Sequence, residues 1–245
     1  MSMEQIHHPH VHKVRVGEVL HVTLNRADQD NRMSNSMLEA LTACVVEASQ
    51  SSRLLVLRAN GPDFCLGRDM PPPPVGSHTT PEQVLRDDAA PVLALLNAIR
   101  ACPVPLLCVV QGRTWGIGLV LAAVSDVAVA CDSSSFRLRE LERGIPPCLA
   151  MAPLLDRMPA QALSHLVLTA GELDVARAVS WGLVGESCPA DQLETVVQAL
   201  VDKMLGFPDA AVRAVKRYLS QAPRHDLGAA AQQGAQMLAQ VLAAR

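Results

Sequence analysis

Residues 105–131, "PLLCVVQGRTWGIGLVLAAVSDVAVAC", contain the pattern that predicts the fold of this chain. An apolar run of strand length, 106–110, is followed by a glycine-bearing segment, an apolar helical run and a second apolar strand over 126–131. Short apolar runs bounded by turn signals are typical of strands that are buried on both faces. A strand, a helix and another strand in this order predict two parallel neighbours in an inner sheet.

The residues before this stretch repeat the same order of elements. The pattern predicts a hairpin whose strands are 12–16 and 19–25, with a tight turn at Gly17 and Glu18. A helix over 35–49 and a buried strand over 53–59 are predicted to follow it. Ser34 or Asn35 is available as the N-cap of the helix. These elements favour one α/β domain whose inner strands are parallel.

A turn-rich return over 60–70 and a polyproline loop over 71–80 follow the strand. Thr80, Pro81 and Gln83 then form a good helix start, which predicts a helix that continues through Ile99. Beyond residue 131 the pattern is mostly helical, with helices expected over 158–170, 174–182, 190–205 and 208–222. The chain therefore reads as an α/β domain with a helical tail.

Composition excludes several functional classes. The 245 residues are 49% hydrophobic with a formal net charge of −3, which argues against nucleic acid as a partner. There is no apolar run of transmembrane length and no signal-peptide pattern at the N-terminus, so we expect a cytoplasmic protein outside the membrane. Seven dispersed cysteines without a C-x-x-C pair predict reduced thiols and no zinc site. The histidines of "HHPHVH", 7–12, could bind a metal, but a frayed terminus explains them better.

The glycines Gly112, Gly116 and Gly118 lie between a strand and a helix. A helix N-terminus offers unpaired N–H groups, and glycine allows another group to approach them, so the site could bind a phosphate or form an oxyanion hole. A dinucleotide fingerprint would need glycine where Leu121 stands, and no Gly-Lys-Ser/Thr of a P-loop follows. The loop "FCLGRDM", 64–70, has a similar form, and the two loops together could hold one oxygen atom.

Five segments resemble the enoyl-CoA hydratase/isomerase (crotonase) superfamily, in the right order and over nearly the whole chain. They are 22–41, 64–70, 110–147, 176–184 and 210–219. The resemblance implies a crotonase-like spiral of β-β-α turns over 1–190, which holds the oxyanion hole, and a C-terminal helical trimerisation region over 191–245. It also implies a homotrimer or a dimer of trimers, and a shared chemistry in which two backbone N–H groups stabilise the enolate of an acyl thioester.

By position, the resemblance assigns the two N–H groups to Arg68 and Ile117 and one catalytic carboxylate to Glu140. The second glutamate of typical hydratases falls at Val120, so ordinary hydration is in doubt. From the residues alone, a solvated loop glutamate paired with a neighbouring arginine is the better interpretation of Glu140, and only the resemblance reverses this preference. Glu142 is its rival if the register differs. Arg68 replaces the alanine that is usual in the family.

The resemblance further implies a substrate pocket at Trp115, Gly116, Val120 and Arg113, and a contact of Lys216 with the carrier. No metal and no cofactor is implied beyond the coenzyme A or phosphopantetheine that carries the substrate. Segments 64–70, 116–126, 136–149 and 178–184 resemble polyketide β-branching dehydratases, which act on a 3-hydroxy-3-methylglutaryl thioester of an acyl carrier protein. For such a substrate Arg68 or Arg113 could supply a cation, and an acidic carrier could dock on Arg137, Arg139, Arg143, Lys216 and Arg217.

Three functions therefore stay open. The first is dehydration of a 3-hydroxyacyl thioester, and the second is isomerisation of an enoyl thioester by Glu140 alone. The third is a non-catalytic scaffold that binds acyl chains or partner proteins. Decarboxylation also occurs in the superfamily.

Overall fold

The computed structural model describes residues 8–70, 80–221 and 227–243. Its main sheet has six strands in the order β1-β2-β3-β4-β6-β9. Only β1 and β2 pair antiparallel, as the predicted hairpin, and the other neighbours are parallel, as the strand–helix alternation predicts. The strands are β1 (Val11–Val16), β2 (Val19–Leu24), β3 (Leu54–Ala59), β4 (Leu106–Val110), β6 (Val127–Cys131) and β9 (Glu186–Cys188).

A second, smaller sheet is formed by β5 (Arg113–Trp115), β7 (Ser135–Arg137) and β8 (Leu173–Asp174). Isolated bridges extend it, because Met33 pairs with Arg68 and Cys65 pairs with Thr114. Successive turns of the chain thus give one segment to the main sheet and one to the second layer. After its two segments, each turn of the spiral continues into a helix or helical run, except the turn that contains β7. This is the expected spiral of β-β-α turns, which arises without any repeat in the sequence.

The helices that follow the first three turns begin where the sequence predicts. They are α1 (Asn35–Ser51), then α2 (Pro81–Val84), a π-helical turn (Leu85–Ala89) and α3 (Ala90–Ala101) in one run, and α4 (Ile117–Val124). Ser34 is the N-cap of α1 and accepts the Met37 N–H at 3.3 Å. Thr80 and Gln83 form a capping box at the start of α2. The π-helical turn was not predicted, because its extra residue does not interrupt the apolar spacing.

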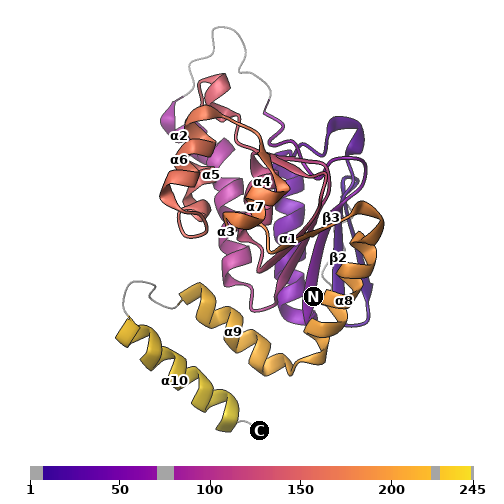
Figure 1. The fold of residues 1–245 in the computed structure, drawn as a ribbon, viewed down its shortest axis with the longest axis vertical. Helices are drawn as coiled ribbons and strands as arrows, with labels where there is room; N and C mark the ends of the chain where they lie inside the picture. Colours follow the sequence, from indigo (N-terminus) through magenta and orange to yellow (C-terminus); the bar gives the residue numbers. More distant parts are fainter. Residues whose placement is uncertain (1–7, 71–79, 222–226, 244–245) are drawn as a thin grey trace.

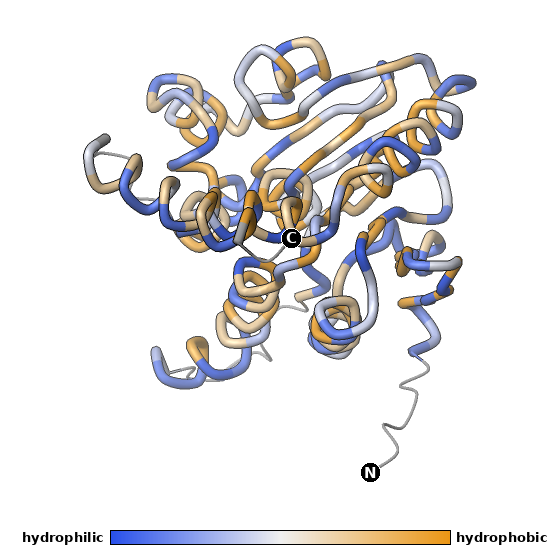
Figure 2. Tube along the Cα trace, turned by 90° about the horizontal axis from the view of Figure 1, so that it is seen from below, coloured by the Kyte–Doolittle hydropathy of each residue, from blue (hydrophilic) through white to orange (hydrophobic). Residues whose placement is uncertain are grey.

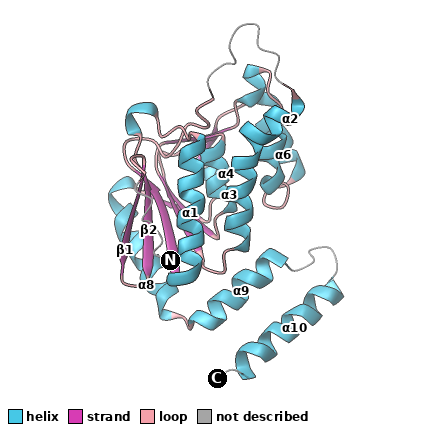
Figure 3. Ribbon diagram, turned by 180° about the vertical axis from the view of Figure 1, so that it is seen from behind, coloured by secondary structure: helices cyan, strands magenta, loops and turns pink. Residues whose placement is uncertain are grey.

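The inner strands β3, β4 and β6 are buried on both faces, which explains their uninterrupted apolar runs. In β3, Leu55 and Leu57 belong to the core on the side of α1, α3 and α4, whereas Leu54 and Val56 belong to the core under α8 (Leu193–Gly206). Figures 1 and 3 show α1 and α3 on one side of the sheet and α8 on the other. The hydropathy colouring of Figure 2 follows this arrangement, with apolar colour along the inner strands.

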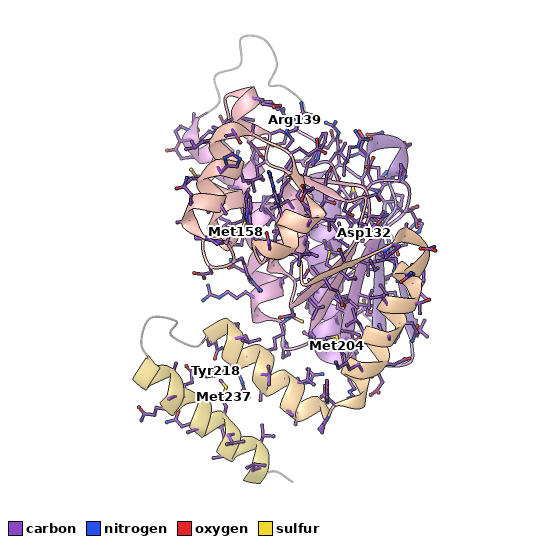
Figure 4. All side chains as sticks on the ribbon, in the orientation of Figure 1. Asp132, Arg139, Met158, Met204, Tyr218 and Met237 are labelled. Carbon is purple, nitrogen blue, oxygen red and sulfur yellow. The ribbon has the colours of Figure 1, made fainter. Side chains whose placement is uncertain are left out.

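The later part of the chain is mostly helical, as predicted, with α5 (Cys148–Met151), α6 (Ala160–Thr169), α7 (Val175–Ser180), α8, α9 (Asp209–Gln221) and α10 (Leu227–Ala243). The helix α10 was not predicted. It packs on α9, where the Tyr218 hydroxyl donates to the Ala230 carbonyl at 2.9 Å (Figures 1 and 4). The polyproline segment 71–79, with His78, lies outside the described residues.

No helix in the described ranges is both long and apolar enough to cross a membrane. All seven cysteines are free, in agreement with the expected reduced thiols, and Cys148 alone among them is exposed.

Candidate active site

Three successive turns of the spiral bring the predicted catalytic groups to the same end of the second layer. Arg68 follows the segment that pairs with β5, Ile117 begins α4 directly after β5 and Gly116, and Glu140 lies three residues after β7. Neighbouring turns of a spiral stack on one another, so residues about fifty and twenty-five positions apart become neighbours. The structure therefore brings the two predicted oxyanion loops and Glu140 together.

Gly116 is the point at which these groups meet. Its backbone has φ +53° and ψ −121°, a conformation open to glycine because it has no Cβ atom. A Cβ atom there would lie 3.1 Å from the Glu140 Oε1 atom and 3.2 Å from the Gly67 Cα atom. The Glu140 carboxylate and both glycine loops are thus in contact range of one another.

Close packing of the backbone requires glycine at positions 112 and 118 as well. A Cβ atom on Gly118 would lie 2.5 Å from the Cys65 carbonyl oxygen, and one on Gly112 would clash with the Pro62 carbonyl. The absence of a side chain at Gly118 lets the first turn of α4 pack directly against the 64–70 loop. This packing sets the distance between the two loops.

The amide groups around the site divide into fixed and free ones. The Gly67 carbonyl accepts the Met33 N–H at 2.9 Å, the Trp115 N–H donates to Cys65 at 2.8 Å, and the Gly116 N–H donates to Arg137 at 2.9 Å. Within the described residues, the N–H groups of Arg68 and Ile117 donate no hydrogen bond. The loops are therefore held by their neighbouring amides, which leaves two donors available for an oxygen atom.

Glu140 is half-buried, at the start of a short 3-10 turn that ends at Arg143. Its Oε2 atom is buried and has no hydrogen-bond partner in the described part of the chain. Burial raises the pKa of this carboxyl above its ordinary value. A carboxyl with a raised pKa takes up and releases a proton more readily near neutral pH, which suits a general acid–base group.

The reading of Glu140 as a solvated loop glutamate is not supported, because its rival Glu142 occupies the neighbouring arginines. Glu142 accepts from Arg139 at 2.9 Å and from Arg137, and these pairs lower its pKa. Glu142 is exposed, so it has the character of a solvated surface carboxylate. Arg143 acts on Glu140 only as a nearby charge.

The two arginines expected to bind a substrate carboxylate have their guanidinium groups engaged by the protein. Arg113 donates to the buried Asp63 at 2.7 Å and 3.1 Å, and its backbone N–H binds the same carboxylate. The Arg68 side chain donates to the Met33 and Asp88 carbonyls and to the Asn35 side chain, which lie before α1, in the π-helical turn and at the start of α1. A substrate carboxylate at either position would therefore compete with these protein partners for the guanidinium group.

Trp115 is half-buried and lies outside both apolar core clusters. Its ring lies under three guanidinium groups, those of Arg139 at 5.0 Å, Arg113 at 5.4 Å and Arg137 at 6.0 Å from the ring centroid. Arg139 is labelled in Figure 4. The stacking explains why this tryptophan sits beside the site without entering the core.

Val120 is 1% exposed and belongs to the main core cluster, so an apolar side chain stands where typical hydratases have a second glutamate. Lys216 lies away from Glu140, buried at 6% exposure, and its ammonium donates to Asp126 at 2.7 Å and to the Val104 carbonyl at 2.6 Å. The structure thus gives Lys216 an internal contact, and a contact with the carrier would require this pair to open. Lys216 and Asp126 also line a groove of about 630 Å³ between α3 and α9.

Sequence reasoning missed the polar side chains that support the loops. Asn31 is 1% exposed with φ +51°, and its amide bonds to the carbonyls of Asn60 and Asp63. Asp63 in turn holds Arg113 beside Gly112. An asparagine or aspartate next to a glycine turn is a weak signal, because such residues are common in any loop.

Within the described ranges, no group of three or more His, Cys, Asp or Glu side chains is arranged to hold a metal ion. His7 lies outside those ranges, and the ring of His12 bonds to the Pro9 carbonyl and to Asn25.

Comparison with known proteins identifies the family. The model of the enoyl-CoA hydratase/isomerase family matches residues 15–245. The chain belongs to this family. It is 31% identical over 197 residues to a probable enoyl-CoA hydratase of Rhodobacter capsulatus, covering 80% of this chain and 75% of that protein. It is 25% identical over 221 residues to the 1,2-epoxyphenylacetyl-CoA isomerase of Escherichia coli, covering 85% and 81%.

The crotonase fold is equally clear from solved structures. The structure of a putative enoyl-CoA hydratase from Thermobifida fusca in complex with CoA superposes with a TM-score of 0.86 at 28% identity, covering 96% of this chain and 93% of the other. This family member is therefore an enzyme of the lyase or isomerase type, built on the crotonase spiral.

Proposed function

We propose that this enzyme transfers a proton at an enolised acyl thioester with Glu140 as its single acid–base group. The first reaction we assign to it is dehydration of a 3-hydroxyacyl thioester. The observation that carries the proposal is the half-buried Glu140 carboxylate, with its free Oε2 atom, directly beside Gly116 and Gly67. The N–H groups of Arg68 and Ile117 are the donors for the thioester oxygen.

One carboxylate is enough for both proton transfers of the dehydration. Glu140 removes a proton from C2, and the electron pair moves into an enolate whose oxygen accepts hydrogen bonds from the amides of Arg68 and Ile117. The enolate then collapses, the C2–C3 double bond forms and the C3–O bond breaks. Glu140 returns its proton to the departing hydroxyl, which leaves as water. The same group acts first as base and then as acid.

The apolar Val120 supports a single-carboxylate mechanism. Addition and elimination of water share one transition state, and typical hydratases divide its proton transfers between two glutamates. With an apolar side chain in the second position, Glu140 has to perform both proton transfers itself. A syn elimination allows this, because the proton leaves and returns on the same face of the substrate.

Isomerisation of a 3-enoyl thioester to a 2-enoyl thioester is the second candidate. In that reaction Glu140 takes a proton from C2 and returns it to C4 through the same enolate. The raised pKa of Glu140 favours this candidate too, because the carboxyl must hold the proton while the double bond moves. A relative named as a CoA isomerase, at 25% identity, is consistent with it.

The substrate carrier is proposed to be coenzyme A, because a structural relative binds CoA. Acyl carrier protein, and a 3-hydroxy-3-methylglutaryl substrate in polyketide biosynthesis, remain narrower predictions. Such a substrate needs a cation for its second carboxylate, and the guanidinium groups of Arg68 and Arg113 are both taken up by the protein. A 3-hydroxyacyl chain without a second carboxylate therefore fits the described residues better.

We further propose a division near residue 190 into the spiral core and a C-terminal helical region that assembles a homotrimer or a dimer of trimers. The support is the composition of α10, which contains no charged residue, and the exposure of Leu238 at 61% and Leu242 at 50%. An uncharged helix with exposed leucines is typical of a surface that is covered in an assembly.

The proposed function is tested by incubating the enzyme with 3-hydroxybutyryl-CoA and with 3-hexenoyl-CoA and following the products by mass and by double-bond position. Loss of one water from the first substrate supports dehydration, and conversion of the second to 2-hexenoyl-CoA supports isomerisation. The Glu140→Gln variant should lose either activity by roughly 10²- to 10⁴-fold.

Glu142→Gln is the matched control, since Glu142 is a glutamate two residues away whose carboxylate is exposed and paired with arginines. It should retain activity. Equal activity of the wild type and Glu140→Gln on every thioester would contradict the single-glutamate mechanism. Inactivity of the wild type on both CoA substrates and on the same acyl groups loaded on a carrier protein would favour the scaffold.

A further inference from the structure

The side chain of Arg68 links three separate elements beside the site. Its Nε atom donates to the Met33 carbonyl at 3.3 Å, its Nη1 atom to the Asp88 carbonyl at 3.1 Å and its Nη2 atom to the Asn35 side chain at 2.5 Å. Met33 precedes α1, Asn35 is the first residue of α1, and Asp88 lies in the π-helical turn before α3. The guanidinium therefore joins the 64–70 loop to two helices.

The π-helical turn presents its carbonyl groups to these side chains. Asn35 donates to the Asp87 carbonyl at 2.8 Å, next to the Asp88 carbonyl that accepts from Arg68. A π-turn widens the helix and is frequent at functional sites. Here the two adjacent carbonyls form, with Asn35 and Arg68, a closed set of hydrogen bonds between the turn and the loop.

Without this side chain, the loop would have less support at Arg68. Its backbone is tied to the Met33 segment, through the Gly67 carbonyl and the Asp69 N–H, and both bonds go to the same residue. A peptide held from one side can still rotate about that side, which would tilt the free Arg68 N–H. Anchors to α1 and to the π-turn oppose this rotation.

We propose that the Arg68 guanidinium is a positioning group for its own backbone N–H, with Asn35 and the π-helical turn as its anchor. This inference rests on the proposed function, in which that N–H binds the thioester oxygen. Because a hydrogen bond weakens steeply when its angle is lost, a small tilt would weaken the stabilisation of the enolate. Binding of the rest of the substrate would be unaffected.

The test compares two ligands that differ only at the carbonyl. Butyryl-CoA has the thioester oxygen, and S-butyl-CoA, its thioether analogue, lacks it. Affinities are measured by calorimetry for the wild type, Arg68→Ala, Arg68→Lys and Asn35→Ala. We expect Arg68→Ala to bind butyryl-CoA about fivefold more weakly and S-butyl-CoA unchanged. Its kcat on the active substrate should fall about tenfold, and its KM should rise by up to the same factor as the loss of affinity for butyryl-CoA, because substrate and analogue share the thioester oxygen.

Arg68→Lys should lose less affinity for butyryl-CoA than Arg68→Ala, because lysine can keep one of the three contacts. The affinity of Asn35→Ala should lie between those of Arg68→Lys and the wild type. Arg86→Ala is the matched control. Arg86 lies in the same π-helical turn, but its side chain is 71% exposed and pairs with Asp87 through the carboxylate. It should bind both ligands as the wild type does.

The outcomes distinguish failure of the oxyanion hole from failure of the positioning role of Arg68. A wild type that binds the two ligands equally overturns the oxyanion hole and with it the proposed function. A wild type that prefers butyryl-CoA, together with an Arg68→Ala variant that keeps this preference or loses affinity for both ligands alike, overturns the positioning role alone. If Arg68→Ala does not fold, Arg68→Lys and Asn35→Ala provide the same comparison.

Discussion

The Oε1 atom of Glu140 lies 3.1 Å from the position that a Cβ atom on Gly116 would occupy. The catalytic carboxylate of the proposed mechanism is thus packed against the glycine that opens α4. A methyl group at this position would press on the carboxylate and on Gly67 at the same time. The alanine that carries it would also have to adopt a φ of +53°.

We therefore expect Gly116→Ala to reduce kcat by about 100-fold or more, because it disturbs the base and the oxyanion loops together. Gly144→Ala is the control, since Gly144 also has a positive φ, of 70°, but no atom lies within 4 Å of its Cβ position. That variant should lose only about 1 kcal/mol of stability and keep its kcat. Equal losses of kcat in the two variants would show that backbone strain alone is responsible.

The raised pKa of Glu140 predicts a pH-dependent effect on stability. A carboxyl whose pKa is higher in the folded state binds its proton more tightly there, so its contribution is fully present below the ordinary value of 4.5 and is lost as the pH rises through the folded-state pKa. Glu140→Gln removes the cost of the buried charge. We expect its Tm to exceed that of the wild type at pH 8 and to equal it below pH 4.5.

The same shift predicts the acid limb of activity. Because the base form of Glu140 appears only above its raised pKa, kcat/KM should rise with pH at a midpoint above 4.5. A pH profile of the wild type provides the measurement. A midpoint at or below the ordinary value of a glutamate would contradict the assignment of Glu140 as the buried base.

The contact of Lys216 with Asp126 predicts a structural effect for the lysine. Lys216→Met should leave the Asp126 carboxylate without its cation and cost about 3 kcal/mol in the free energy of unfolding, measured by denaturant titration. The double variant Lys216→Met with Asp126→Asn should recover part of that loss. A higher KM for a CoA substrate at unchanged stability would instead favour the predicted contact with the carrier.

The uncharged helix α10 predicts the assembly. Replacing Leu238 and Leu242 by glutamate introduces charges into the proposed subunit interface, and we expect the trimer or hexamer to dissociate in sedimentation experiments. The exposed Leu168, 76% accessible on α6, is the control for a glutamate on the surface. A wild type that is monomeric at micromolar concentration would contradict the proposed assembly.

Much of the local structure could be predicted from the sequence, because it depends on neighbouring residues. The Gly17 turn, the Ser34 cap and the capping box of Thr80 and Gln83 all rest on contacts within a few positions. The π-helical turn and α10 were missed.

The sequence alone predicted the order of β1, β2, β3, β4 and β6 with the helices between them, their parallel inner sheet and, through its resemblance to a family, candidate roles for Arg68, Ile117 and Glu140. Tertiary structure was needed to establish that the Oε2 atom of Glu140 is buried while Glu142 pairs with arginines, and that the Arg68 and Arg113 guanidinium groups bond to protein partners. The physical reason is that local patterning reports periodicity and turn chemistry. The burial and partners of a charged side chain depend on elements that pack beside it from distant parts of the chain.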